Sequence, residues 1–119
     1  MPQSKSGSFA TRNHIANLQS NYIIELKKID SNSFYRKWNN GLLEIFGLLA
    51  PGGQMLQTRT VTFPIPFINT NYFVFHQYEG NTAMYSGVLK NEKTKNNCNI
   101  MLNDSSGALG YYYIVGFYK

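Results

Sequence analysis

Short runs in which apolar and polar residues alternate follow one another along most of the chain, with turn-forming residues between them. In one such run Phe34, Arg36 and Trp38 would share one side of an extended chain. Tyr35 and Lys37 would share the other side. Alternation with a period of two is typical of β-strands, because successive side chains point to opposite faces. The sequence therefore predicts about eight strands: residues 21–29, the two arms of a hairpin over 33–49, and residues 56–63, 72–78, 82–89, 98–102 and 110–118.

Turn signals separate these runs at intervals of roughly ten residues. The hairpin turns at Asn39-Asn40-Gly41, residue types that tolerate the positive φ of tight hairpin turns. Breaks follow at Pro51-Gly52-Gly53 and at Pro64-Ile65-Pro66, since proline cannot donate to a sheet ladder. Strands do not alternate with helices, which excludes a parallel α/β fold. The predicted fold class is all-β: an antiparallel β-sandwich of about eight strands with a short N-terminal stem.

The first twenty residues differ from the remainder of the chain. Residues 1–20 are expected to form a linker or stem, helical or irregular, and residues 21–119 the sandwich domain. Ile15, Leu18, Tyr22 and Ile29 follow a heptad-like spacing that would suit the end of a coiled coil. Two heptads are too few to decide between that interpretation and a strand that begins near Asn21.

The composition agrees with one β domain. Of 119 residues, 15% are aromatic and only 14% charged, which is not the composition of a helical bundle. The net charge is +5, but the densest basic cluster, Lys90, Lys93 and Lys95, is interrupted by Glu92 and asparagines. We interpret this cluster as a solvated loop, and without a nucleic-acid-binding motif we expect no nucleic-acid partner.

Redox, metal and membrane functions find little support in the sequence. Cys98 is the one cysteine, so no internal disulfide can form, and its strand-like setting suggests a small buried residue. His14 and His76 lack a metal-ligand spacing, so no metal or other cofactor is expected, and His76 is interpreted as a packed histidine. No cleavable leader is recognised near Met1, and no apolar run is long enough to span a bilayer, so no membrane insertion is expected.

Acidic residues are too few to indicate hydrolysis. A glycosidase needs two carboxylates held across a cleft, and among six acidic residues only Glu79 and Asp104 fall in turns that could approach one another. We therefore expect no catalytic residues and no enzyme. For Glu44 we expect a cross-strand pair with Arg36 or Lys37 in the hairpin.

Three segments together resemble the C-terminal receptor-binding domain of bacteriophage tail fibres, the gp53-like group. The hairpin is similar to an aromatic-Arg-x-Trp-Ser/Asn-Asp/Asn-Gly-x-x-Glu pattern in this group, here at residues 35–44. The segment Thr60–Phe67 is similar to a Val-Thr-Phe-Pro segment, and the aromatic strand over residues 110–119 to the usual C-terminal strand. The chain departs in its Asn-Asn-Gly turn, in Ile-Phe-Gly after Glu44, and in Tyr and Phe where a C-terminal Trp is common.

The resemblance implies a role and partners. It implies a homotrimer at the distal end of a tail fibre, in a virion or a phage-derived tail-like particle. Such a tip would bind a bacterial surface polysaccharide or outer-surface protein and catalyse nothing. Two alternatives stay open: a structural trimerisation or capping domain without receptor contact, and a capsule depolymerase.

The aromatic content fits trimerisation, because an apolar surplus on a protein surface usually marks an interface. Trp38, Tyr72, Tyr111 and Tyr113 are the aromatic residues assigned to the core or the trimer interface. For Trp38 a sugar-stacking role is the alternative. The full apparent surplus is Tyr35, Phe46, Phe67, Tyr72, Tyr85, Tyr111, Tyr112, Tyr113 and Tyr118.

The strand count also predicts which loops face the receptor. If the chain enters from the stem and every strand reverses direction, the turns after odd-numbered strands are distal. These turns are 30–33, 50–55, 79–82 and 103–109, whereas the loop 90–97 faces the stem. Short polar side chains on loops over a rigid scaffold suit recognition of hydroxyl groups. The candidate ligand-binding residues are therefore Asn32, Gln54, Glu79, Asn81, Asp104, Ser105 and Ser106.

Overall fold

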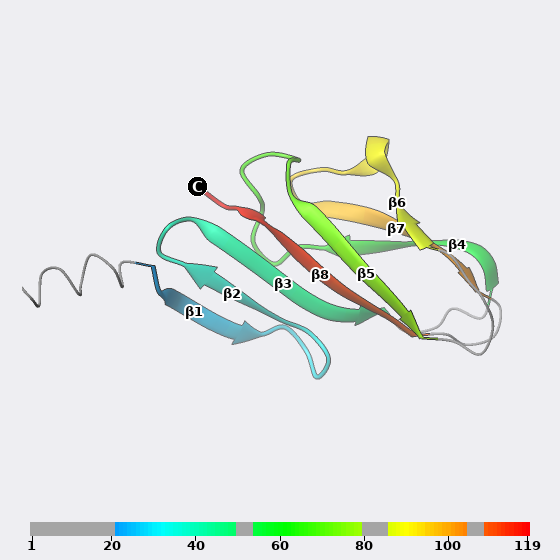
Figure 1. Ribbon diagram of the computed structural model, residues 1–119, viewed down its shortest axis with the longest axis horizontal. Coiled ribbons are helices and arrows are strands. Elements are labelled where there is room, and N and C mark those ends of the chain that lie inside the picture. Colours follow the sequence, from blue (N-terminus) through cyan, green and yellow to red (C-terminus); the bar gives the residue numbers. More distant parts are fainter. Residues whose placement is uncertain (1–20, 50–53, 80–85, 105–108) are drawn as a thin grey trace, which may run out of the picture.

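Eight antiparallel strands make up nearly all of the regular structure (Figure 1). The computed structural model describes residues 21–49, 54–79, 86–104 and 109–119. One turn of 3-10 helix, η1 (Lys90–Glu92), interrupts the strands in the described part of the chain. The all-β prediction is confirmed. The strands are β1 (Ile23–Lys28), β2 (Phe34–Trp38), β3 (Leu42–Leu49), β4 (Gln54–Thr62), β5 (Phe73–Glu79), β6 (Ser86–Val88), β7 (Asn97–Asp104) and β8 (Leu109–Phe117).

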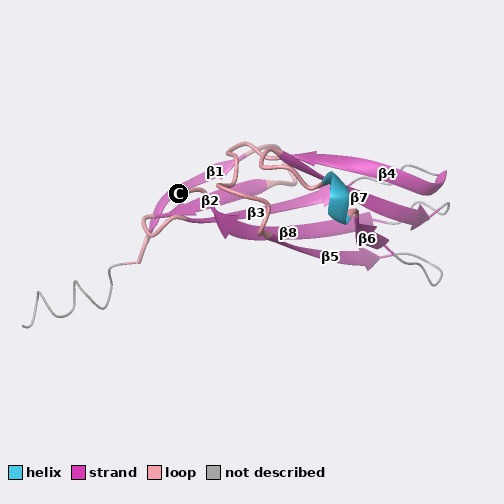
Figure 2. Cartoon of the chain, turned by 90° about the horizontal axis from the view of Figure 1, so that it is seen from above, coloured by secondary structure: helices cyan, strands magenta, loops and turns pink. Residues whose placement is uncertain are grey.

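The strands form two sheets that lie in two layers (Figure 2). The larger sheet has the order β1-β2-β3-β8-β5 and the smaller one the order β4-β7-β6. Strand β8 lies between β3 and β5 and pairs antiparallel with both. The antiparallel sandwich is therefore confirmed, with its C-terminal strand inside the larger sheet.

Pairing register assigns each residue of the larger sheet to a face. Ile45 pairs with Ile114, which pairs on its other side with Val74, and these three side chains face the smaller sheet. The next residue of each strand points the opposite way, because side chains alternate. We call the face that points away from the smaller sheet the outer face.

The core lies between the two sheets. Ile45 and Ile114 are completely buried, as are Cys98 and Ile100 of β7 on the opposite side. The cysteine is thus the small buried residue that its setting predicted. Three aromatic rings close one end of the core in mutual contact, with centroids 4.7–5.2 Å apart: Phe63, Phe67 and Tyr72.

Strand ends gather at two poles. At one pole lie the β1–β2 turn, the end of β3, the start of β4, the end of β5 and the end of β7, as the pairings Leu49–Gly110 and Gln54–Asp104 require. We call it the turn pole. At the opposite pole lie the 39–41 turn, the 63–72 loop, η1 and the chain end at Lys119. The strand count predicted that these strand ends would share a pole; which pole is distal stays a prediction.

The hairpin turn depends on the residues that marked it in the sequence. Gly41 adopts φ of 100°, a conformation that a side chain would strain. The Asn40 side chain accepts a hydrogen bond from the Leu42 amide at 3.0 Å. The amide of Tyr118 donates to the Gly41 carbonyl at 2.8 Å, which ties the turn to the C-terminal strand.

Some sequence-based expectations need adjustment. Strand bounds agree to within a few residues, except that β6 covers only Ser86–Val88 of the predicted strand 82–89, whose first four residues lie outside the described ones. Tyr35, Phe67 and Tyr72 are not surplus aromatics, because they are buried in the core of the single chain. The expected stem, residues 1–20, also lies outside the described residues.

We predict that Gly116→Ala destabilises the fold. A Cβ atom at Gly116 would stand 2.7 Å from Tyr72 Cβ and 2.9 Å from the Phe67 ring, so packed atoms would have to move. The expected loss is about 1–3 kcal/mol of unfolding free energy, measured as a lower urea midpoint. Gly87→Ala is the matched control, because a Cβ at Gly87 meets nothing within 4 Å. Equal midpoints for the two variants would contradict the prediction.

Candidate binding face on the five-stranded sheet

A row of four aromatic rings crosses the outer face. Phe34 of β2, Phe46 of β3, Tyr113 of β8 and Phe75 of β5 are neighbours in the strand register. Their ring centroids are 4.5, 4.7 and 5.8 Å apart in that order. Cross-strand aromatic pairs stabilise a sheet, and here the pairs continue over four strands. We call these residues the aromatic row.

The aromatic row is only partly covered. Phe75 exposes 56% of its surface and Phe73, two residues earlier on β5, exposes 67%. Tyr111 and Phe117 of β8 are also exposed on this face. A groove of about 470 Å³ runs beside the row, and amide side chains join its aromatic lining. The groove is lined by Asn32, Phe34, Phe46, Gly47, Phe75, His76, Gln77, Tyr111, Tyr112 and Tyr113.

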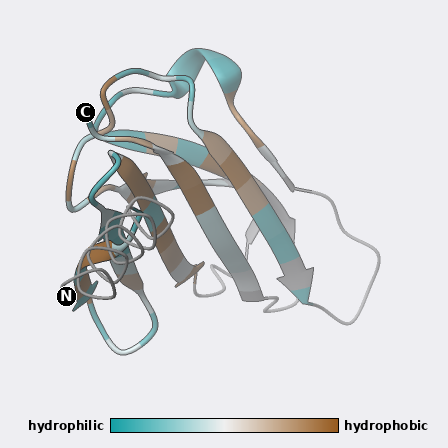
Figure 3. Ribbon diagram, turned by 60° about the vertical axis from the view of Figure 1, so that its left-hand side comes forward, coloured by the Kyte–Doolittle hydropathy of each residue, from teal (hydrophilic) through white to brown (hydrophobic). Residues whose placement is uncertain are grey.

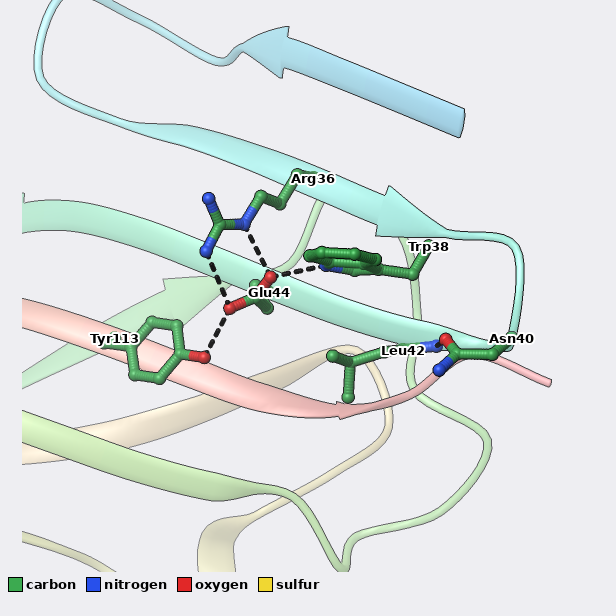
Figure 4. A network of polar contacts seen from close by, with 6 residues as sticks. All are labelled: Arg36, Trp38, Asn40, Leu42, Glu44 and Tyr113. Carbon is green, nitrogen blue, oxygen red and sulfur yellow. Dashed lines mark hydrogen bonds and ion pairs between the residues drawn. The ribbon is translucent and has the colours of Figure 1, made fainter. Parts of the chain in front are cut away.

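A buried carboxylate holds the Tyr113 ring of the aromatic row in place (Figure 4). Glu44 is 5% exposed and accepts hydrogen bonds from three side chains on β2 and β8. Arg36 binds both carboxylate oxygens, with Nε 2.5 Å from Oε1 and a terminal nitrogen 3.1 Å from Oε2. Trp38 Nε1 donates to Oε1 at 2.6 Å, and the Tyr113 hydroxyl donates to Oε2 at 2.5 Å. The expected pair of Glu44 with Arg36 is confirmed, and the two residues lie directly opposite in the register.

These contacts keep Glu44 ionised. Burial alone would raise its pKa, but the hydrogen bonds from Arg36, Tyr113 and Trp38 outweigh burial and lower the pKa to about 2. Burial and the same carboxylate raise the pKa of Tyr113 to about 12. The Arg36 guanidinium also lies 5.1 Å from the centre of the Phe46 ring. The network therefore orients Arg36, Trp38 and Tyr113 on one face of the sheet.

Strand β1 extends the apolar surface at the sheet edge. Every residue of β1 is exposed, and Leu26, which pairs with Arg36, exposes 65% of its surface. Ile23 and Ile24 are exposed too. An edge strand has no neighbouring strand on one side, so another chain can pair with its backbone there or pack on its exposed aliphatic side chains.

The predicted ligand-binding residues fall at the turn pole as far as they are described. Asn32 lies in the β1–β2 turn, where its amide is bonded to the Asp30 carboxylate at 2.8 Å. Glu79 ends β5 and is exposed. Gln54 and Asp104 begin β4 and end β7, and their backbones pair. Asn81, Ser105 and Ser106 lie outside the described residues.

The four aromatic residues assigned to the core or an interface separate into two groups. Tyr72 belongs to the core, where its hydroxyl donates to the carbonyls of Thr94 and Asn97. Trp38, Tyr111 and Tyr113 lie on the outer face of the larger sheet. Trp38 is partly buried by its contact with Glu44.

Sequence reasoning missed Phe34, Phe73 and Phe75 as members of this face. Alternation within residues 72–78 places Phe73 and Phe75 together, opposite Tyr72 and Val74, and this signal was available. Which of the two sets faces the core depends on the pairing of β5 with β8, which the sequence does not show.

The described residues offer binding surfaces and little reactive chemistry. No group of three or more metal-ligand side chains occurs among them. His76 is half-buried on the inner face, where burial lowers its pKa. Among the residues that the structure describes, no helix has the length and apolar character to cross a membrane.

A family model decides the wider relationship. The model described as "tail fiber protein gp53-like, C-terminal" matches residues 37–117, about two-thirds of the chain. The chain belongs to this tail fibre family. The match contains part of the hairpin, with Trp38 and Glu44, and all of the C-terminal strand β8. No curated protein sequence matches the chain.

Solved structures show the same fold in pyocin tail fibres. The N-truncated R1-type pyocin tail fibre is 16% identical, with a TM-score of 0.59 over 91% of this chain and 94% of that one. A P. aeruginosa R2 pyocin fibre is 17% identical, with a TM-score of 0.55 over 78% of this chain. The chain covers only 26% of that longer fibre fragment. At these identities the likeness concerns the fold.

We predict that Glu44→Gln weakens the fold and flattens its response to acid. A lowered pKa means that the folded state binds the proton less readily than the unfolded state, so stability is present above pH 4.5 and is lost as pH falls towards 2. The expected loss at neutral pH is about 2 kcal/mol, allowing for the partial exposure of Arg36.

Urea unfolding between pH 2 and 7 measures this effect. Glu79→Gln removes the same charge from an exposed position and serves as the control. If Glu44→Gln kept the acid dependence of the unmodified protein, the assignment of that dependence to Glu44 would be wrong.

Proposed function

We propose that the chain is the receptor-binding tip of a tail fibre, acts as a homotrimer, and recognises a bacterial surface polysaccharide or outer-surface protein without catalysis. Its place would be the distal end of the fibre in a virion or a phage-derived tail-like particle. Membership of the gp53-like family supports the fibre role, and the fold shared with pyocin fibres fits either kind of particle. The exposed aromatic row is the observation that carries the trimer.

The outer face has the character of a subunit interface. Its exposed members Phe75, Tyr111 and Phe117 lie on the two neighbouring strands β5 and β8. Aromatic residues are enriched at interfaces, and an isolated soluble domain rarely exposes so many on one face. Close packing of three copies around an axis would bury these rings and the aliphatic side chains of β1.

The turn pole is the surface that we assign to the receptor. The β1–β2 turn, the start of β4 and the ends of β3, β5 and β7 lie there, and the candidate ligand residues among them are polar. Trimerisation would present three copies of this pole side by side. Linked weak sites gain affinity through effective concentration, so each site alone can be weak.

Two rival functions give different results in the same assays. A capping domain would form the trimer but lose no binding when the turn pole is altered. A depolymerase would release new reducing ends from the polysaccharide that it binds. The receptor-binding tip would bind the polysaccharide and release no reducing ends from it.

We predict that Phe75→Ser impairs trimer formation. Light scattering should give about three times 13.6 kDa for the unmodified protein and a lower mass for the variant, because each proposed subunit contact loses an exposed aromatic ring. Ile68→Ser is the matched control, since Ile68 is a 49% exposed apolar residue in a loop of the opposite pole. A monomeric unmodified protein would contradict the trimer, and a fully trimeric Phe75→Ser would contradict its assigned face.

We predict that the turn pole carries receptor binding. On a bacterial strain that binds the labelled trimer, Asn32→Ala and Glu79→Ala should each weaken binding several-fold, because each removes a polar contact from the turn pole. Asn91→Ala, an exposed asparagine in η1 at the opposite pole, should bind as the unmodified protein does. Unchanged binding by both turn-pole variants as intact trimers would favour the capping function.

A further inference from the structure

Two adjoining hollows lie beside the first residues of β5, away from the turn pole. The larger, of about 480 Å³, and the smaller, of about 280 Å³, share Tyr72, Phe73, Lys90 and Lys93. Thr70 and Asn71 complete the larger hollow. Lys90 and Lys93 come from η1 and the residue after it, which carry the hydrophilic colour at the top of Figure 3. We call the two hollows together the lysine cleft.

One of its two ammonium groups is held in position. Lys93 Nζ donates a hydrogen bond to the Tyr72 carbonyl at 2.8 Å and lies 4.3 Å from the centre of the Tyr72 ring. Tyr72 is itself fixed in the core by hydrogen bonds from its hydroxyl to the carbonyls of Thr94 and Asn97. An ammonium has three N–H groups, so a Lys93 fixed by one carbonyl can still donate to a ligand. Lys90 is exposed beside it.

The lining brings together positive charge and no acidic residue. Among the described residues, none that lines either hollow is Asp or Glu. The nearest acidic residue along the chain, Glu92, accepts a hydrogen bond from Asn99 Nδ2 at 2.8 Å. Two lysines without a carboxylate in the lining leave a site whose charge favours an anion.

The remaining lining suits a sugar ring. Phe73 presents a largely exposed flat ring, which can cover the apolar C–H face of a pyranose. Thr70 and Asn71 supply a hydroxyl and an amide that can pair with sugar hydroxyls. A concave site with one apolar wall and a few convergent polar groups is typical of small-ligand sites.

We propose that the lysine cleft binds an acidic sugar unit, its carboxylate on the ammonium groups of Lys90 and Lys93 and its ring on Phe73. The cleft is a second site, at the pole opposite the turn pole. Lys90 and Lys93 belong to the basic cluster that we interpreted from the sequence as a solvated loop, and the proposal gives these two lysines a specific role. The proposal does not depend on trimerisation or on receptor binding by the turn pole.

Titration of the whole chain with free glucuronate tests the proposal, read by backbone amide NMR. We expect saturable shifts in the millimolar range at Phe73 and at residues 90–93, and weakening with added salt. Glucose should shift the same amides only at higher concentration, because it lacks the carboxylate. Acetate should also bind more weakly, because it lacks the ring. Absent shifts in the cleft, or equal affinity for acetate and glucuronate, would overturn the proposal.

Substitutions then separate the contribution of the lysine charge from that of the Phe73 ring. Lys90→Gln should weaken glucuronate binding about threefold or more, as expected for loss of one exposed charge at the site. Lys28→Gln, which removes an exposed lysine from β1 at the far edge of the sheet, should leave binding unchanged. Phe73→Leu should weaken glucuronate binding and leave acetate binding as it was. Equal weakening by Lys90→Gln and Lys28→Gln would show a general charge effect and overturn the site.

Glucose 6-phosphate distinguishes the kind of anion. The two ammonium groups can bind a phosphate as well as a carboxylate. Tighter binding of glucuronate than of glucose 6-phosphate supports the sugar acid, whereas the reverse order would overturn the carboxylate assignment. The titrations use free sugars and not host cells. Loss of host binding by the turn-pole variants would therefore leave glucuronate binding in the lysine cleft unchanged.

Discussion

The larger sheet carries apolar side chains on both faces, but the smaller sheet covers only one of them. Ile45 and Ile114 are completely buried on the inner face, while Phe75 on the outer face exposes more than half of its surface. The three-stranded sheet packs on one face of the five-stranded sheet and leaves the other face uncovered. This uncovered face is the one that the proposed trimer would bury, and burial of its rings would add to the apolar surface already buried within each chain.

The Glu44 network connects this face to the β2–β3 hairpin, part of which lies within the family match. One carboxylate accepts hydrogen bonds from Arg36, Trp38 and Tyr113, and so links β2, β3 and β8. A buried charge is costly unless it is paired, and here its pairing makes the position of all four side chains interdependent. The ionised carboxylate thus sets the shape of the outer face before any partner binds.

Local patterns were sufficient for much of the fold. The Asn39-Asn40-Gly41 turn fixes the hairpin register, and that register alone places Glu44 opposite Arg36. Counting strand reversals was sufficient to bring residues as distant as Asn32 and Asp104 to one pole. The assignment of buried aromatics was less successful, because Tyr35 and Phe67 look like surplus rings until the smaller sheet is seen to cover them.

The sequence by itself determined the strands, their turns, the antiparallel class and the family, because each depends on neighbouring residues or short motifs. Only the tertiary structure decided which side of β5 is buried, since that depends on its pairing with β8 and on the position of the smaller sheet. The same holds for the lysine cleft. Lys93 and Tyr72 are 21 positions apart, and only the packing of two loops at one pole brings the ammonium to the Tyr72 carbonyl.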